Sequence, residues 1–123
     1  DPKYVNLCLD SGHIVNGGGD PVELVEKYPE RITYVHIKAF DEDITKEAHE
    51  KDWPFGEAVA KGASVCPPEG IPEMHAFVDA LAKLDKDIYC ICEQDCYPCE
   101  PTFPKQNAIN MRNYLADCGL GLK

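Results

Sequence analysis

Long apolar runs are missing from this chain of 123 residues. No stretch approaches the roughly 20 apolar residues that a membrane-spanning helix requires, so we expect no membrane partner. The N-terminus, Asp1-Pro2-Lys3-Tyr4, lacks an initiator Met and has no basic region followed by an apolar core. A secretory signal would have such a region. We therefore expect a cytoplasmic protein, and a chain that is either a piece of something longer or a processed product.

Positive charge is also scarce. Lys and Arg together number 12 against 22 Asp and Glu, and the net charge is -10. Proteins that bind nucleic acid place clustered Lys and Arg against the phosphates, so this balance argues against a nucleic-acid partner. Part of the acidity is concentrated in residues 41–52, which we expect to form a solvated face.

Cysteine, in contrast, is abundant. The chain has seven Cys, an odd number, together with 44% hydrophobic and 28% charged residues, which is the composition of one soluble globular domain. Cys8, Cys90 and Cys92 lie inside apolar runs, where a free Cys behaves as a small buried hydrophobe. With no secretory signal, reduced thiols are the expected state.

Two further cysteines form a C-x-x-C motif, Cys96-Tyr97-Pro98-Cys99. Such a motif can be a redox pair, half of a zinc site, or simply a loop with two thiols. A thioredoxin-like pair opens a helix after the first strand of its fold, whereas this motif follows the last strand-like run and leads into Glu100-Pro101. A structural zinc ion needs two more ligands at matching spacing, and the remaining cysteines are single. The loop interpretation is therefore favoured.

Three short runs with β-prone, apolar bodies end in polar residues. They are residues 6–13, 32–38 and 88–95, and segments between them have helical periodicity. Helices are predicted over residues 20–29, 72–85 and 104–118, and a loop over residues 13–19. Residues 39–66 are less regular, with a possible helix in the acidic stretch and a short strand or loop at residues 63–66. Strands that alternate with helices form a parallel sheet with its polar tips at one edge.

Counting the run at residues 63–66, the chain contains about four parallel βα units. This predicts the α/β class, and specifically half of a (β/α)₈ TIM barrel, with residues 1–123 as a single partial domain. A half-barrel would leave two sheet edges open, which proteins normally cover.

Side-chain alternation along the strands brings three polar tips to one face. Asp10, His36 and Glu93 would then converge at the carboxyl ends of the strands, where an Asp, a His and a Glu make a nitrogen and oxygen site for a divalent metal. Taken singly, the His is also compatible with a hydrogen-bonded core residue and the Asp with a helix cap. Glu93 follows an apolar strand, where an unpaired charge would be costly.

The same residues carry a resemblance to a known family. Leu9-Asp10-Ser11-Gly12-His13 resembles the D-x-G-H motif of the xylose-isomerase-like TIM-barrel superfamily of sugar phosphate isomerases and epimerases. Residues 34–38 resemble its H-x-K strand. Residues 55–70 and the Glu-Gln-Asp ending at residues 93–95 are similar to segments of the inosose (2-keto-myo-inositol) dehydratases, as is the last helix at residues 110–115. The resemblance covers the whole chain and places it in the C-terminal half of the family fold.

The resemblance implies a divalent ion (manganese, cobalt, magnesium or zinc) held by Asp10, His36, Glu93 and one further Glu that this sequence does not contain. It also implies that Glu93 and Lys38 act in catalysis, Glu93 by moving a proton and Lys38 by stabilising enolate charge. His13 and Lys38 would bind substrate. Alternatives remain for both. His13 is also compatible with a loop residue or with a residue that contacts the ligands and not the substrate. Lys38 is also compatible with a structural ion pair with Glu93 or Asp95.

The implied activity is that of a metal-dependent enzyme acting on a small-molecule sugar or cyclitol through an enolate. A dehydratase-like lyase and a keto-sugar isomerase or epimerase share this step, and the sequence leaves both open. A second hypothesis is a non-catalytic half-barrel that needs its own missing N-terminal half or another copy, as a homo-oligomer. A DNA-repair endonuclease of the same superfamily is disfavoured by the acidity. Ala39 also departs from the family pattern, which has Asp at that place.

Overall fold

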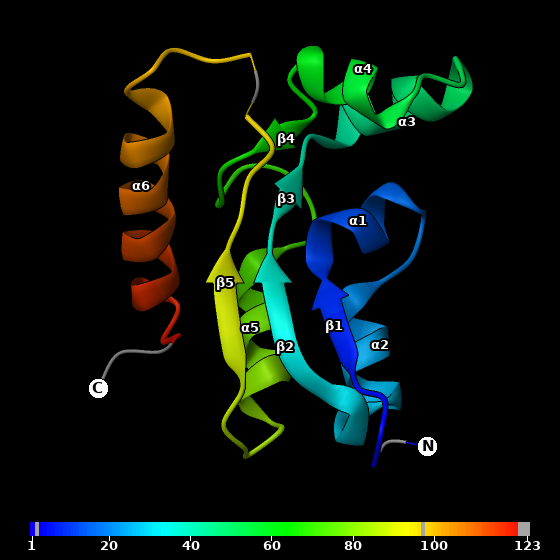
Figure 1. The fold of residues 1–123 in the computed structure, drawn as a ribbon, viewed down its shortest axis with the longest axis vertical. Helices are drawn as coiled ribbons and strands as arrows, with labels where there is room; N and C mark the ends of the chain where they lie inside the picture. The colour runs from blue at the N-terminus through cyan, green and yellow to red at the C-terminus, as the bar shows by residue number, and fades with distance from the viewer. Residues whose placement is uncertain (2, 97, 121–123) are drawn as a thin grey trace.

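The structure is a computed structural model that describes residues 1, 3–96 and 98–120. This part of the chain forms five strands and six α-helices (Figure 1). The strands are β1 (Leu7–Asp10), β2 (Ile32–Ile37), β3 (Ala39–Phe40), β4 (Ser64–Val65) and β5 (Tyr89–Cys92). The helices are α1 (Ser11–Asn16), α2 (Pro21–Lys27), α3 (Glu42–Glu50), α4 (Phe55–Ala60), α5 (Met74–Ala82) and α6 (Phe103–Asp117), with a 3₁₀ turn, η1, at Pro29–Arg31.

The main sheet has three parallel strands in the order β1-β2-β5. Its register sets Asp10 beside His36 and His36 beside Ile91. The ladder continues one step beyond β5, because the backbone N–H of Glu93 donates to the carbonyl of Ile37 at 3.0 Å. The three polar tips therefore leave the sheet at the same level, and the predicted parallel α/β arrangement of these runs is confirmed.

The fourth parallel βα unit predicted at residues 63–66 is wrong. These residues form β4, which pairs antiparallel with β3, so that Ala39 lies opposite Val65. The pairing is possible because the chain reverses after α4, where the Asp41 N–H bonds to the Ala63 carbonyl at 2.7 Å. The described chain thus has three parallel strands, and the half-barrel stays a prediction.

The loop predicted at residues 13–19 is also wrong in part, because α1 begins directly after β1. Asp10 is its N-cap: one carboxylate oxygen accepts from the His13 N–H at 2.9 Å. A short polar side chain at this position satisfies a backbone donor that would otherwise lack a partner. The helix ends where the Gly19 N–H returns to the Ile14 carbonyl at 2.8 Å.

One face of the main sheet is covered by helices and carries the main core. Helices α2 and α5 lie against this face (Figure 1), and Phe77 of α5 is fully buried with Leu9 and Val35. The opposite face has no such cover among the described residues. Cys8 is exposed there, contrary to the expectation of a buried thiol, and the Tyr89 side chain is 72% exposed.

A second, smaller core lies beyond the carboxyl ends of the strands. It contains four buried residues from β3, α3, α4 and the turn after α4: Phe40, Ala48, Ala58 and Ala63. Trp53 packs against it, with the amino groups of Lys51 and Lys61 at 5.3 and 4.5 Å from its ring centre. The acidic stretch predicted as a solvated face forms α3, with Thr45 and Ala48 as its buried positions. This smaller core, with α3 and α4, lies beyond the end of the sheet at which the polar tips are found (Figure 1).

Helix α5 is capped by Glu73, whose carboxylate accepts from the Ala76 and His75 N–H groups at 2.7 and 3.0 Å. These backbone bonds lower the pKa of Glu73 below its ordinary value. Replacement by Ala is expected to reduce the free energy of unfolding by about 0.5–1 kcal/mol near neutral pH. Because the folded pKa is lowered, the wild type keeps this contribution above the ordinary carboxyl range and loses it as the pH falls through the folded pKa.

Urea titrations at neutral and acidic pH measure this difference. Glu69→Ala is the matched control, since Glu69 is an exposed carboxylate nearby that caps no helix. The interpretation is wrong if the cost of Glu73→Ala is the same at both pH values.

No helix among the described residues has the length and apolar character needed to cross a membrane.

Candidate metal centre

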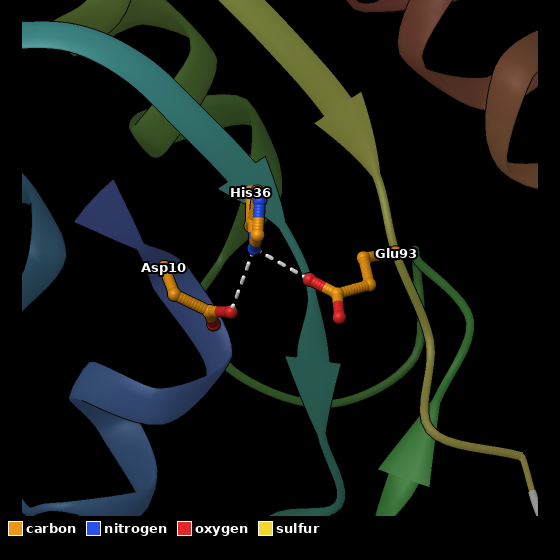
Figure 2. A group of neighbouring side chains, drawn as sticks. All are labelled: Asp10, His36 and Glu93. Atoms are coloured by element: carbon orange, nitrogen blue, oxygen red, sulfur yellow. Dashed lines mark ion pairs between the residues drawn. The ribbon is translucent and has the colours of Figure 1, made fainter. Parts of the chain in front are cut away.

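The three predicted ligands meet at the carboxyl end of the sheet. Figure 2 shows the imidazole of His36 between the carboxylates of Asp10 and Glu93. His36 Nδ1 lies 3.3 Å from Asp10 Oδ2 and 2.5 Å from Glu93 Oε2. One ligand atom from each residue lies within 4.8 Å of the other two. Each residue comes from a different strand end, so the parallel sheet alone creates the group.

The backbone around each of these residues sets the position of its side chain. Asp10 uses one oxygen to cap α1 and leaves the other directed at His36. His36 stands on the uncovered face of β2, because its neighbours Val35 and Ile37 are buried among the helices. Glu93 follows the last residue of β5 and is held there by its backbone bond to Ile37.

The donor set suits a divalent cation. Glu93 Oε2 is buried and has no hydrogen-bond partner within the described structure, even though His36 Nδ1 is close to it. A buried carboxylate oxygen without a hydrogen bond is costly unless a positive charge compensates it. Two carboxylates and an imidazole are ligands that zinc, manganese and cobalt accept. The residues present therefore fit a divalent metal.

Lys38 is buried directly beside this group, with a side chain only 1% exposed. Its ammonium nitrogen lies 3.4 Å from both Asp10 Oδ2 and Glu93 Oε1. It also donates a hydrogen bond to Asp95 Oδ2 at 3.0 Å. Burial by itself lowers the pKa of Lys38, but the Asp95 hydrogen bond and the three carboxylate charges outweigh it, so the pKa is raised. Lys38 is therefore a fixed positive charge at neutral pH.

His13 lies at the rim of the same site. Its Nε2 is 3.3 Å from the Lys38 ammonium and 3.9 Å from Asp10 Oδ2. Its ring packs against Phe55 of α4, with ring centres 5.0 Å apart. The side chain is 49% exposed, so it can reach a small molecule above the site. The expected role of His13 in substrate binding stays a prediction.

One residue of the site, Ser11, was not predicted from the sequence. Ser11 is fully buried, and its hydroxyl accepts from the Lys38 N–H at 2.9 Å and donates to the Lys38 carbonyl at 2.7 Å. The ion pair of Lys38 with Glu93 or Asp95, left open by the sequence, is present with both residues. The available signal for Ser11 was its place within the D-x-G-H motif.

The cysteine motif does not contribute to this site as a ligand. Tyr97 lies outside the described residues. Within the described part of the chain, Asp10, His36 and Glu93 are the only group of three or more potential ligands close enough to share an ion. Cys96 and Cys99 line a small hollow of about 200 Å³ together with Asp95 and Ser64. The structure therefore gives no support to a zinc site at the motif.

No family model matches the sequence. An inosose dehydratase of Clostridium tetani is 32% identical over 117 residues, 95% of this chain and 39% of the relative. One from Geobacillus kaustophilus is 34% identical over 98 residues, 80% of this chain and 32% of the relative. The rhizopine catabolism protein MocC of Rhizobium meliloti is 33% identical over 123 residues, 98% of this chain and 38% of the relative. The chain thus spans roughly a third to two fifths of their length.

Proposed function

We propose that this chain is the C-terminal part of a divalent-metal-dependent lyase of the inosose dehydratase type, which acts on a cyclitol ketone. The observation that carries the proposal is the convergence of Asp10, His36 and Glu93 next to a buried, charged Lys38. The names of the relatives support a lyase over a keto-sugar isomerase or epimerase, which remains the second candidate. The activity belongs to the complete protein, since the chain covers only part of those relatives.

A divalent ion held by Asp10, His36 and Glu93 would polarise the carbonyl and hydroxyl oxygens of the substrate. Glu93 has a second oxygen, Oε1, and acts as the base that takes the proton from the carbon next to the carbonyl. Lys38 places a positive charge beside that oxygen and stabilises the developing enolate. His13, at the exposed rim, binds a substrate hydroxyl.

The overall reaction is an elimination of water. The electron pair of the broken C–H bond forms the enolate. The C–O bond on the neighbouring carbon then breaks, the enolate pair becomes a C=C bond, and the hydroxyl leaves as water with the proton that Glu93 took up. An isomerase would make the same enolate and return the proton to carbon instead of releasing hydroxide. The two outcomes therefore differ in whether the proton goes to a leaving hydroxyl or back to carbon, and product analysis distinguishes them.

In the proposed protein, this chain is one part of a TIM barrel, and residues outside the chain complete the barrel. The uncovered sheet face supports this idea, because Tyr34, Tyr89 and Ile91 expose at least a third of their area beside the ligands. Exposed aromatic and aliphatic residues on a sheet face are typical of a surface that another element covers. A missing Glu would arrive with that element, either from a preceding N-terminal half or from a second copy. We expect the isolated chain to be inactive, and the complete protein to be cytoplasmic.

The test uses the complete protein purified with and without a chelator. The metal-free form is expected to lose dehydration of a cyclitol ketone, followed as an unsaturated product, and to regain it when manganese, cobalt, magnesium or zinc is supplied. A panel of keto-sugars tests the isomerase alternative, and abasic DNA at low salt tests the endonuclease. Undiminished dehydration after complete metal removal would falsify the proposal.

A further inference from the structure

Lys38 contacts more negative charge than the metal group alone provides. Its ammonium lies 3.4 Å from Asp10 and Glu93, but its shortest contact is with Asp95, at 3.0 Å. Asp95 is not within the group of residues that can share a metal ion. Three carboxylates thus surround one buried ammonium, which leaves an excess of negative charge that matches one divalent cation.

Asp95 is held in place by hydrogen bonds that do not involve the metal group. Its backbone N–H donates to the Ser64 hydroxyl of β4 at 3.1 Å. The preceding residue, Gln94, donates its side-chain amide to the Ser64 carbonyl at 3.0 Å and accepts from Asn107, a buried residue of α6. The segment is therefore fastened to both β4 and α6, and Asp95 reaches Lys38 from a rigid support.

We infer that Asp95 is a positioning residue that draws the Lys38 ammonium toward itself and keeps its contacts with Asp10 and Glu93 at the longer distance of 3.4 Å, so that these two carboxylates stay available for a divalent metal. The inference rests on the proposed metal site. Without the Asp95 charge, Lys38 keeps only the two carboxylates that the metal needs, and its ammonium competes with the metal for them. A buried ammonium that lacks its closest counter-ion strengthens its remaining ion pairs, because an unpaired buried charge is costly.

The test is a calorimetric titration of Mn²⁺ into the complete protein, which supplies the missing Glu, at neutral pH and low salt. Asp95→Asn keeps the shape of the side chain and removes its charge. It is expected to weaken Mn²⁺ binding by about 10- to 100-fold, as for other residues that orient metal ligands. Lys38→Met, which removes the competing ammonium at similar length, is expected to bind Mn²⁺ at least as tightly as the wild type.

The double variant decides the mechanism. If Asp95 acts through Lys38, then Lys38→Met in the Asp95→Asn background restores the Mn²⁺ affinity to within about threefold of Lys38→Met alone, a coupling between neighbours that a double-mutant cycle measures. If Asp95 only supports the local fold, the double variant binds as weakly as Asp95→Asn, and the inference fails. Equal affinity of Asp95→Asn and wild type also overturns it.

Two controls separate this inference from the proposed function. Asp87→Asn removes one exposed negative charge at the opposite end of β5 from Glu93 and is expected to leave the Mn²⁺ affinity unchanged. Thermal unfolding of each metal-free variant reports whether the fold is retained. A complete wild-type protein that binds no Mn²⁺ overturns both the metal site and the inference, whereas tight wild-type binding with unchanged Asp95→Asn affinity overturns the inference alone.

Discussion

His36→Ala is expected to weaken divalent-metal binding by at least about 100-fold and to abolish turnover by the complete protein. The imidazole lies between the two carboxylates, 3.3 Å from Asp10 Oδ2 and 2.5 Å from Glu93 Oε2. Its loss leaves a pair of carboxylates that the Lys38 ammonium already contacts on both sides. Metal analysis of the purified variant, together with the dehydration assay, measures both effects.

The matched control is His49→Ala, because His49 is an exposed histidine on α3 with no contact to the metal group. It is expected to keep the metal content and the rate of the wild type. Retention of metal and turnover by His36→Ala would show that the site is assigned wrongly.

Gly12→Ala is expected to reduce the free energy of unfolding by about 1–3 kcal/mol and to weaken metal binding at the same time. A Cβ atom at this position would lie 2.6 Å from Lys38 Cγ and 2.6 Å from Phe40 Cε2. Both neighbours are fully buried, so neither can move into solvent. The Lys38 stem must shift, and its ammonium then shifts relative to Asp10 and Glu93.

Gly56→Ala in α4 is the control for this change, because a Cβ there would meet no atom within 4 Å. Alanine favours a helix over glycine by roughly 0.5–1 kcal/mol, so the control is expected to be neutral or slightly stabilising. Urea unfolding and Mn²⁺ titration of both variants provide the comparison. Equal stability and affinity of Gly12→Ala and wild type would mean that the Lys38 stem is free to relax.

The effect at Gly12 also explains part of the D-x-G-H motif in physical terms. Gly12 lies in the first turn of α1, where a Cβ would also lie 2.8 Å from Lys38 Cδ, so the turn packs directly against the Lys38 stem. Only a residue without a side chain leaves the necessary space. The Gly is therefore explained by Lys38, which lies 26 positions further along the chain, and not by a need for unusual backbone angles.

Periodicity was sufficient for the main strands and most of the helices. The apolar bodies of β1, β2 and β5 and the Asp20-Pro21 start of α2 are local signals, and the structure confirms each of them. Side-chain alternation also indicated that Asp10, His36 and Glu93 share a face, and they do come together. Identification of the α/β class needed no more than these patterns.

The sequence patterns gave the wrong structure at two places, residues 63–66 and residues 13–19. Residues 63–66 have an extended, apolar pattern that is compatible with a parallel or an antiparallel strand, and the return of the chain after α4 selected the antiparallel pairing with β3. The glycines at positions 17–19 indicated a loop over residues 13–19, but the Asp10 cap begins α1 at Ser11 and the helix continues to Asn16. The first outcome depends on β3, which is distant in the sequence, and the second on Asp10, which both caps α1 and faces His36.

The sequence by itself determined which strands carry Asp10, His36 and Glu93, because alternation along a strand is a property of the local backbone. Only the tertiary structure decided that Lys38 is buried among them and that Asp95 is its closest counter-ion. Those contacts depend on how β4 and α6 hold residues 94–95, and no local pattern encodes the distance between charges that are 57 positions apart. The three ligands can thus be predicted from the sequence, whereas the contacts of Lys38 with the three carboxylates are a result of folding.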